Sequence, residues 1–370
     1  MKIVIDDRIP FIRGVFEPFA EVVYLPGKSI APEHVADADA LIVRTRTRCD
    51  QALLGNSKVR FVATATIGFD HINTAELARC GIQWSNAPGC NAASVKNYIA
   101  SALAAMDMPL QGRTMGIIGV GHVGSKVAAV AEAFGMNILL NDPPRADREG
   151  AAGFTGLDQL LADSDIVTLH VPLECGGKYP TLNMAGEEFF RKMRRNSWFF
   201  NSCRGEAVVE NALIGAVESG KLAGVLMDVW PGEPEVSKKL LDAVKFGTPH
   251  IAGYSVDGKA NGTTASVRFI AGKLGITGLS DWQPSALPAP VFPAVIDLAG
   301  CNSAEEAVKK AVLHAYDIRY DSEALLAEPS QFEHLRGSYW VRREFSAYKV
   351  INAPDEAVES LRKLDFNIDM

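Results

Sequence analysis

Three charged or titratable side chains each follow an apolar run that could form a buried strand. Arg204 lies in N-S-C-R-G, Glu233 in D-V-W-P-G-E-P and His250 in T-P-H-I-A-G-Y. An arginine offers a two-pronged donor to a carboxylate or to a polarised carbonyl oxygen. A histidine titrates near neutral pH and can take the proton of an alcohol as a hydride leaves. A carboxylate bound to its other ring nitrogen would orient the imidazole and favour its protonated form.

Each of these residues also has a plainer explanation. Arg204 could form a structural salt bridge, Glu233 could be a solvated loop acid, and His250 could be a core histidine. The three motifs nevertheless follow strands of the same half of the chain, and ligands of parallel sheets bind at the carboxyl ends of the strands. We therefore expect the three side chains to share one edge of a sheet.

A glycine-rich turn predicts what binds at that edge. The sequence Gly119-Val-Gly121-His122-Val123-Gly124 follows the apolar run 115–120 and opens a helical pattern. Glycines allow a tight turn and a close approach of the backbone, and a helix N-terminus attracts a pyrophosphate.

Asp142 ends the next predicted strand, where an acidic side chain would bind the ribose 2′-hydroxyl and repel a 2′-phosphate. The pattern favours NAD over NADP, although Arg145 and Arg148 could soften that preference. The alternative is an ordinary strand–turn–helix in which Asp142 caps the helix before Pro143. Arginine, glutamate and histidine around NAD describe an alcohol or hydroxy-acid dehydrogenase.

The elements that must position these residues alternate between strand and helix. Continuous apolar runs predict parallel strands covered on both faces, in a doubly wound α/β sheet. A long helix of low polarity is expected at 91–106, between domains. The expected strands are Lys2–Ile5, Glu21–Leu25, Ala40–Val43, Arg60–Ala65, Ile82–Ser85, Met115–Val120, Asn137–Asn141, Ile166–Val171, Ser197–Asn201, Gly224–Val229 and a short one at Pro249–Ala252.

The composition excludes several classes of function. The 370 residues are 48% apolar and 22% charged, with a formal net charge of −7, which disfavours a nucleic-acid partner. No stretch is long and apolar enough for a membrane helix, and the N-terminus carries two aspartates where an export signal would be apolar. The six cysteines include no C-x-x-C pair. Reduced thiols in a cytoplasmic protein without a metal site are expected.

Beyond a proline-rich linker near 282–290, a small α/β unit is expected up to residue 370. It contains no catalytic motif, because His314 and His334 stand alone. The stretches 291–298 and 304–316 are apolar enough that so small a unit would gain by burying them against a partner. A two-fold homodimer through this unit is the expected assembly.

The motifs G-x-G-x-x-G…D, N-x-x-R-G, D-V-x-x-x-E-P and H-x-x-G resemble, in this order, those of the D-isomer-specific 2-hydroxyacid dehydrogenases. The resemblance covers roughly residues 1–280. It implies a Rossmann-type NAD domain (93–257) inserted in a smaller flavodoxin-like substrate domain (1–92 with 258–285). A C-terminal dimerisation domain (286–370) follows. It implies that Arg204, Glu233 and His250 are catalytic.

The resemblance also implies a set of binding residues. The cofactor contacts would be Gly119, Gly121, His122, Val123, Gly124, Asp142, Val171, Ser202, Cys203, Arg204, Asp228 and Gly253. At Val171 the family commonly has a threonine, so a hydroxyl contact is lost there.

Further stretches, among them R-T-R-T-R at 44–48, resemble one branch of the family that acts on a phosphorylated hydroxy acid. Thr45, Thr66 and Tyr254 would then contact substrate. Arg44, with Arg46 and Arg48 as weaker candidates, could hold a phosphate, although a solvated basic edge is the alternative. Two other functions stay open: a 3-phosphoglycerate or other D-2-hydroxyacid dehydrogenase, and a non-catalytic scaffold that senses NAD(H).

Overall fold

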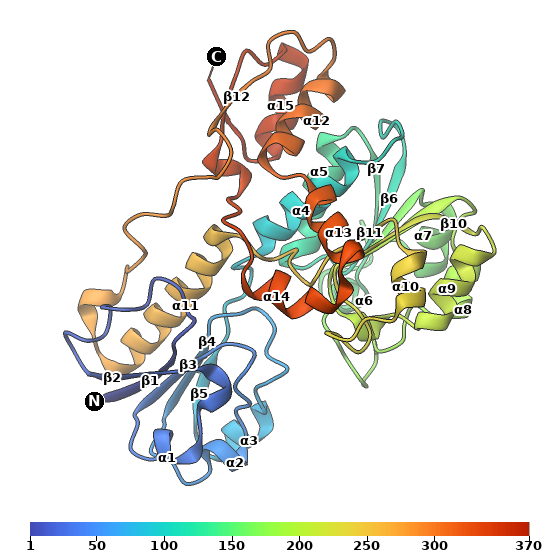
Figure 1. The fold of residues 1–370 in the computed structure, drawn as a ribbon. Helices are drawn as coiled ribbons and strands as arrows, with labels where there is room; N and C mark the ends of the chain where they lie inside the picture. The colour runs from blue at the N-terminus through green and yellow to red at the C-terminus, as the bar shows by residue number, and fades with distance from the viewer. Residues whose placement is uncertain (370) are drawn as a thin grey trace. The chain divides into compact units, whose positions relative to one another are not determined.

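The computed structural model describes residues 1–369, which divide into two compact units (Figure 1). The N-terminal unit combines Met1–Asn91 with Ser255–Pro288. The cofactor unit combines Ala92–Tyr254 with the residues from Ala289 onward, which we call the C-terminal segment. The predicted division into three domains therefore stays a prediction, since the C-terminal segment groups with the cofactor unit. Within the described residues, no helix is long and apolar enough to cross a membrane.

The N-terminal unit is built on a parallel sheet with the strand order β2-β1-β3-β4-β5. Its central strands are buried on both faces, as their continuous apolar sequences predict. Its strands are β1 (Lys2–Asp6), β2 (Glu21–Leu25), β3 (Ala40–Val43), β4 (Phe61–Thr64) and β5 (Gln83–Ser85). Its helices are α1 (Pro32–Val35), α2 (Gln51–Leu54), α3 (Thr74–Arg79) and α11 (Val256–Leu274).

The cofactor unit contains a six-stranded parallel sheet with the order β11-β10-β9-β8-β6-β7. Separate apolar clusters form on its two faces, one with α4 and α5 and one with α7 to α9, so the sheet is doubly wound. The strands are β6 (Thr114–Ile118), β7 (Asn137–Asn141), β8 (Ile166–Leu169), β9 (Ser197–Asn201), β10 (Leu222–Met227) and β11 (Phe246–Gly247). The helices are α4 (Ala92–Ala104), α5 (His122–Ala133), α6 (Pro143–Glu149), α7 (Leu157–Asp163), α8 (Glu187–Lys192), α9 (Glu210–Glu218) and α10 (Lys238–Ala243).

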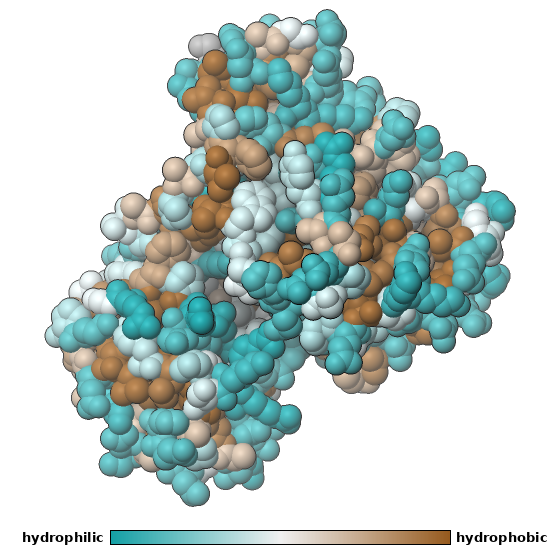
Figure 2. Space-filling view, in the orientation of Figure 1, coloured by the Kyte–Doolittle hydropathy of each residue, from teal (hydrophilic) through white to brown (hydrophobic). Residues whose placement is uncertain are grey.

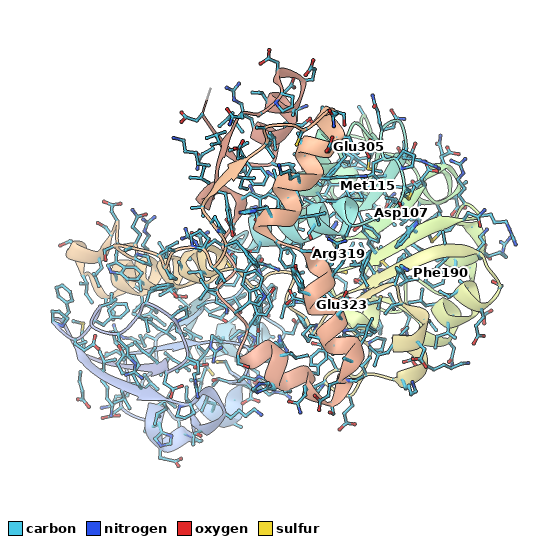
Figure 3. The ribbon with its side chains drawn as sticks, turned by 45° about the horizontal axis from the view of Figure 1, so that its top comes forward. Asp107, Met115, Phe190, Glu305, Arg319 and Glu323 are labelled. Carbon is cyan, nitrogen blue, oxygen red and sulfur yellow. The ribbon has the colours of Figure 1, made fainter. Side chains whose placement is uncertain are left out.

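The C-terminal segment adds a small parallel sheet with the order β12-β13-β14 and four helices. In Figure 3, Glu305 marks α12, and Arg319 and Glu323 mark α13, the next helix along the chain. α13 lies against the short edge strand β11, where the Ser322 hydroxyl accepts the N–H of Gly247 at 3.0 Å. The elements are β12 (Val295–Asp297), α12 (Ala304–Ala315), α13 (Ile318–Ala327), α14 (Phe332–Gly337), β13 (Lys349–Ile351), α15 (Asp355–Lys363) and β14 (Asn367–Ile368).

The long apolar helix expected at 91–106 is α4, and almost every residue in it is buried. It packs against α5 on the cofactor sheet and against α12 of the C-terminal segment. Its polar side chains bond to that segment: Ser94 to Glu344 at 2.9 Å and Lys96 to Asp365 at 2.8 Å. The apolar face of α12, for which a second chain was expected, is thus covered largely within this chain.

One predicted strand is wrong. Residues 249–252 form a turn, and the sixth strand of the sheet, β11, ends before them at Gly247. Pro249 has no N–H to donate to a neighbouring strand, and His250 has a φ of 56°, which no strand tolerates. The N–H groups of Ile251 and Ala252 bond to a side chain instead of a strand.

Candidate active site

The three predicted catalytic residues follow three neighbouring strands of the cofactor sheet. Arg204 comes after β9, Glu233 after β10 and His250 after β11, and these strands are adjacent and parallel. Their loops therefore meet at the carboxyl edge of the sheet. A Cβ added to Gly205 would lie 2.1 Å from the carbonyl carbon of Trp230, so only glycine lets the first two loops approach this closely.

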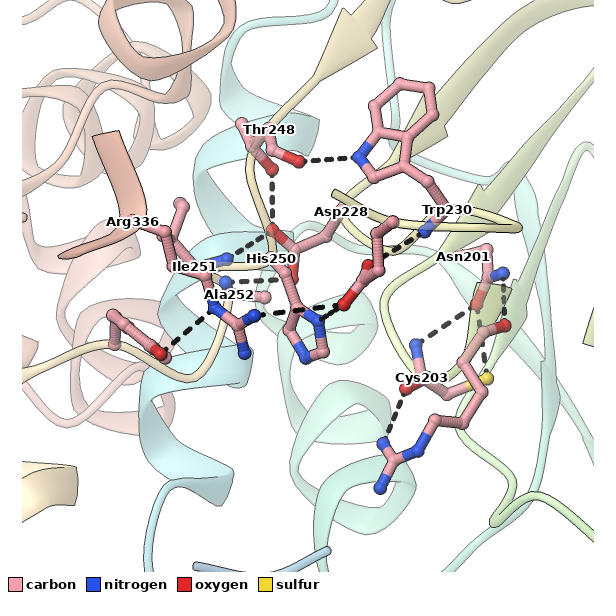
Figure 4. A network of polar contacts seen from close by, with 12 residues as sticks. Asn201, Cys203, Asp228, Trp230, Thr248, His250, Ile251, Ala252 and Arg336 are labelled. Atoms are coloured by element: carbon pink, nitrogen blue, oxygen red, sulfur yellow. Dashed lines mark hydrogen bonds and ion pairs between the residues drawn. The ribbon is translucent and has the colours of Figure 1, made fainter. Parts of the chain in front are cut away.

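Glu233 and His250 are in direct contact, within the network of polar contacts around His250 that Figure 4 draws. Oε1 of Glu233 forms a short hydrogen bond to Nδ1 of His250, while Oε2 accepts the backbone N–H of Trp230 at 3.2 Å. Burial raises the pKa of Glu233, but the hydrogen bond and charge of His250, the Trp230 N–H and the charge of Arg336 together hold it below its ordinary value. Glu233 is therefore an anion that fixes the imidazole with Nε2 pointing away from it.

A buried carboxylate shapes the turn that carries His250. Asp228 is 1% exposed, and its oxygens accept three hydrogen bonds, from the Thr248 hydroxyl and from the N–H groups of Ile251 and Ala252. Burial raises the pKa of Asp228 in spite of these bonds. The structure gives Asp228 a role in holding this turn, and its expected contact with the cofactor carboxamide stays a prediction.

Arg204 is held in its loop by Asn201. The Asn201 side chain accepts the N–H of Cys203 at 3.1 Å and donates to the carbonyl of Arg204 at 2.8 Å. The Arg204 guanidinium donates to the carbonyl of Cys203 at 2.7 Å. Sequence reasoning identified Arg204 but missed Asn201, although an amide at the end of a buried strand is the kind of residue that braces such a turn.

The glycine loop has the geometry that a dinucleotide requires. Gly119 has a φ of 86°, and a Cβ there would meet the His170 carbonyl at 2.6 Å and the side chain of Val171 at 2.9 Å. A Cβ on Gly124 would meet the carbonyl of Gly119 at 2.0 Å, whereas one on Gly121 would meet nothing within 4 Å. The first and third glycines are required by packing, and the second leaves space in front of the N-terminus of α5.

Asp142 follows β7 as predicted, beside the glycine loop. Its Oδ2 accepts the N–H of Val120 at 2.8 Å, and its Oδ1 accepts the N–H of Arg145 and caps α6. The structure thus shows the capping role given above as the alternative, at the position where a ribose carboxylate is needed. Arg145 is held by Glu149 and by the carbonyl of Val120.

One buried polar atom fits a bound cofactor. Within the described residues, the hydroxyl of Ser202 is buried and has no hydrogen-bond partner. It follows β9 at the carboxyl edge of the sheet, beside Cys203, which is also buried. A buried hydroxyl without a partner costs free energy unless a ligand or water supplies one. Ser202 and the glycine loop therefore fit a dinucleotide at this edge.

The predicted substrate residues of the N-terminal unit are placed as follows. Thr45 is exposed in the turn after β3, whereas Arg44 pairs with the buried carboxylate of Asp6 through its Nε and Nη2 at 3.2 and 3.1 Å. This ion pair is a structural role for Arg44. Thr66 shares a hydrogen bond with Thr64 at 2.8 Å and donates to the carbonyl of Gly68.

Comparisons with known proteins bear on the family to which this chain belongs. Residues 90–252 match the family model described as D-isomer specific 2-hydroxyacid dehydrogenase, NAD binding domain, and residues 286–364 match a domain of unknown function. An NAD-bound 3-phosphoglycerate dehydrogenase from Entamoeba histolytica is 25% identical, with a TM-score of 0.64 over 78% of this chain and 99% of that one. D-Lactate dehydrogenase from Aquifex aeolicus has a TM-score of 0.62 at 24% identity, over 78% of this chain and 100% of that one.

Two curated relatives match almost the full chain. One from Bacteroides fragilis is 46% identical over 95% of this chain and 99% of its own length. One from Escherichia coli is 41% identical over 99% of this chain and 98% of its own length. The chain therefore belongs to the D-isomer-specific 2-hydroxyacid dehydrogenases, a family of NAD-dependent oxidoreductases, which confirms the resemblance seen in the motifs. Both relatives are named erythronate-4-phosphate dehydrogenase.

Proposed function

We propose that this protein oxidises 4-phospho-D-erythronate to 2-oxo-3-hydroxy-4-phosphobutanoate with NAD, in the biosynthesis of pyridoxal 5′-phosphate (vitamin B6). The near-complete coverage of the two named relatives carries the choice of substrate. The Glu233–His250 contact supports the chemistry, because it leaves Nε2 of the imidazole as the proton acceptor. Arg204 supplies the positive charge that a 2-hydroxy carboxylate needs.

The reaction removes a hydride and a proton from one carbon–oxygen unit. NAD, when bound, supplies the acceptor of the hydride that leaves C2. Nε2 of His250 takes the proton of the C2 hydroxyl, and Glu233 stabilises the imidazolium that forms. Arg204 holds the carboxylate and polarises the C2 oxygen. Thr45, Thr66 and Tyr254 contact the remainder of the substrate, and the residues after β6, β8 and β9 line the cofactor.

A substrate panel tests the proposal. NADH formation is measured with 4-phospho-D-erythronate, 3-phospho-D-glycerate and D-lactate at equal concentrations, with a His250→Gln variant as the matched control. We expect the highest kcat/KM for 4-phospho-D-erythronate and little turnover of any acid by the variant. A preference for 3-phospho-D-glycerate would replace the proposed substrate. Turnover of no acid by the wild-type protein would favour an NAD(H)-sensing scaffold.

We further propose a cytoplasmic homodimer held by the C-terminal segment. Apolar side chains gather on the surface around its small sheet (Figure 2). Val291, which precedes β12, and Val295 are more than half exposed. Val295 begins β12, which is an edge strand of that sheet. Exposed apolar residues on an unpaired edge are a typical basis for a symmetric contact. The six cysteines are free thiols, which suits a reducing compartment.

A further inference from the structure

An arginine of the C-terminal segment lies at the Glu233–His250 pair. Arg336 is on α14, and its Nη1 lies 3.9 Å from Oε1 of Glu233, the oxygen that bonds to His250. Its Nε donates to the hydroxyl of Tyr254 at 3.1 Å, and its guanidinium carbon lies 5.7 Å from the centre of the tyrosine ring. Figure 4 draws Arg336 in the same network of polar contacts as His250 and Asp228. The Arg336 side chain is only 18% exposed.

The environment of Arg336 holds a charge there in spite of burial. Burial alone would lower the pKa of Arg336, but Tyr254, Glu233 and Asp228 together raise it above its ordinary value. A largely buried cation costs free energy unless anions and acceptors offset its desolvation. The 3.9 Å separation from Glu233 is an ion pair without a hydrogen bond, so Glu233 keeps its bond to His250.

We propose that Arg336 is a positioning residue of the active site, through which the C-terminal segment sets the charge of the Glu233–His250 pair and the orientation of Tyr254. This inference needs one element of the proposed function, namely that His250 accepts a proton during the reaction. The Tyr254 oxygen accepts the Nε–H of Arg336, so the hydroxyl proton of Tyr254 is directed away from Arg336.

The charges around the pair give the expected sign. Asp228 and Glu233 favour a proton on the imidazole, whereas Arg336 opposes it. The second cation near the turn, Arg342, is buried and donates to the carbonyl of Ala252 at 2.6 Å. The other titratable groups of α14, Glu333 and His334, are exposed on the surface of the segment, where solvent screens them.

Loss of the Arg336 charge should therefore keep the pair protonated to higher pH. Removing a unit charge beside a titrating pair in a partly buried site shifts the titration by about one to two pH units. In the direction of hydroxy-acid oxidation the imidazole must be neutral to accept a proton. The acidic limb of the pH profile of kcat/KM should therefore move to higher pH by at least about one unit. Activity below the limb should fall about tenfold, with NADH affinity unchanged.

The test compares Arg336→Gln, Arg336→Lys and Arg319→Gln in the full-length protein, with the hydroxy acid that the wild type oxidises best. Arg319 is a matched control, because it is an arginine of the same segment that pairs with Asp317 at the start of α13. We expect the displaced limb for Arg336→Gln, a limb near the wild-type position for Arg336→Lys, and a wild-type profile for Arg319→Gln. NADH affinity, measured by fluorescence, should be the same in all four proteins.

A wild-type limb in a folded Arg336→Gln variant would overturn the proposal, and so would an equal displacement in Arg319→Gln. If Arg336→Gln lacks the wild-type circular dichroism spectrum, Arg336→Lys decides. A limb at the wild-type position then supports the role of the charge, and a limb displaced upward overturns it. Because any oxidised hydroxy acid serves, this result is independent of which substrate the panel selects.

Discussion

Asp228 and Ala252 are joined by a hydrogen bond of 2.9 Å from the backbone N–H of Ala252 to Oδ2 of the carboxylate. Oδ1 accepts the N–H of Ile251 and the hydroxyl of Thr248, both at 2.7 Å. The left-handed backbone of His250 lies between these bonds, with a φ of 56°. A conformation that costs free energy at a non-glycine residue is thus held by a buried side chain.

Replacing Asp228 by asparagine should loosen this turn. Asparagine keeps the shape but turns one of the two acceptors into a donor that faces an N–H group. We expect a loss of about 1–3 kcal/mol in the free energy of unfolding and at least a tenfold loss of turnover. Urea denaturation and steady-state kinetics measure the two effects. Wild-type stability and turnover in Asp228→Asn would show that the carboxylate does not hold the turn.

Removing His250 or Arg204 should abolish most turnover and leave NADH binding largely intact. Neither side chain belongs to the glycine loop, and general acid–base catalysis contributes about 10²–10⁴-fold. Losses of that order are expected for His250→Ala and Arg204→Ala, measured beside NADH titration by fluorescence. Near wild-type turnover in His250→Ala would remove the histidine from the proposed mechanism.

Asp142 should set the cofactor preference. In Asp142→Ala the repulsion of a 2′-phosphate disappears, so the ratio of kcat/KM for NADP to that for NAD should rise. The variant also loses the cap of α6, which should cost about 1 kcal/mol of stability. The matched control is Asp147→Ala, which removes an exposed acid of α6. Asn141→Ala would not serve, because the Asn141 side chain bonds to the carbonyl of Thr155. A wild-type protein that prefers NADP would contradict the assignment.

Two histidines should make the fold sensitive to mild acid. Burial lowers the pKa of His71 to about 4 and that of His170 to about 3, and each ring bonds to a threonine hydroxyl through Nε2. The unfolded chain binds these protons from about pH 6.5 downward, so stability is lost as pH falls from there toward the folded pKa. Each histidine contributes a slope of up to about 1.4 kcal/mol per pH unit. His71→Gln should flatten the slope measured by urea denaturation between pH 7 and pH 5.

Truncation after Trp282 should give a poorly soluble protein. The truncation uncovers α4, in which almost every residue is buried. It also removes Asp365, the ion-pair partner of Lys96. Light scattering should show a dimer for the full-length chain and aggregates for the truncated one. A truncated chain that stays a stable dimer, or a full-length monomer, would contradict the proposed role of the C-terminal segment in assembly.

The sequence predicts the cofactor sheet well because its signals are local. Gly119, Gly121 and Gly124 follow a strand directly, and a fixed spacing carries their meaning. Arg204 and Glu233 likewise follow apolar runs whose ends can be read within a few residues. The position of β11 was missed because a two-residue edge strand has no pattern of its own and Pro249 marks its end only in retrospect.

Arg336 could not be found in this way. It lies 82 residues from Tyr254 in the chain, on a helix of six residues, and no motif surrounds it. The packing of α13 against β11, and of α14 against α13, brings it to Glu233. The ion pair Arg44–Asp6 was missed for a related reason, since a basic run does not reveal the buried acid that faces it, and the contact of Arg44 with a phosphate stays a prediction.

The burial of α4 also has a consequence for the order in which the chain acquires its structure. Asn97 accepts the N–H of Phe345, and Ser94 bonds to Glu344, across 248 and 250 residues. Synthesis runs from the N-terminus, so α4 leaves the ribosome long before its partners exist. The face of α4 that packs against α12 therefore stays uncovered until translation is nearly over. Contacts so distant in the sequence slow folding, and an apolar helix left exposed in the meantime favours aggregation.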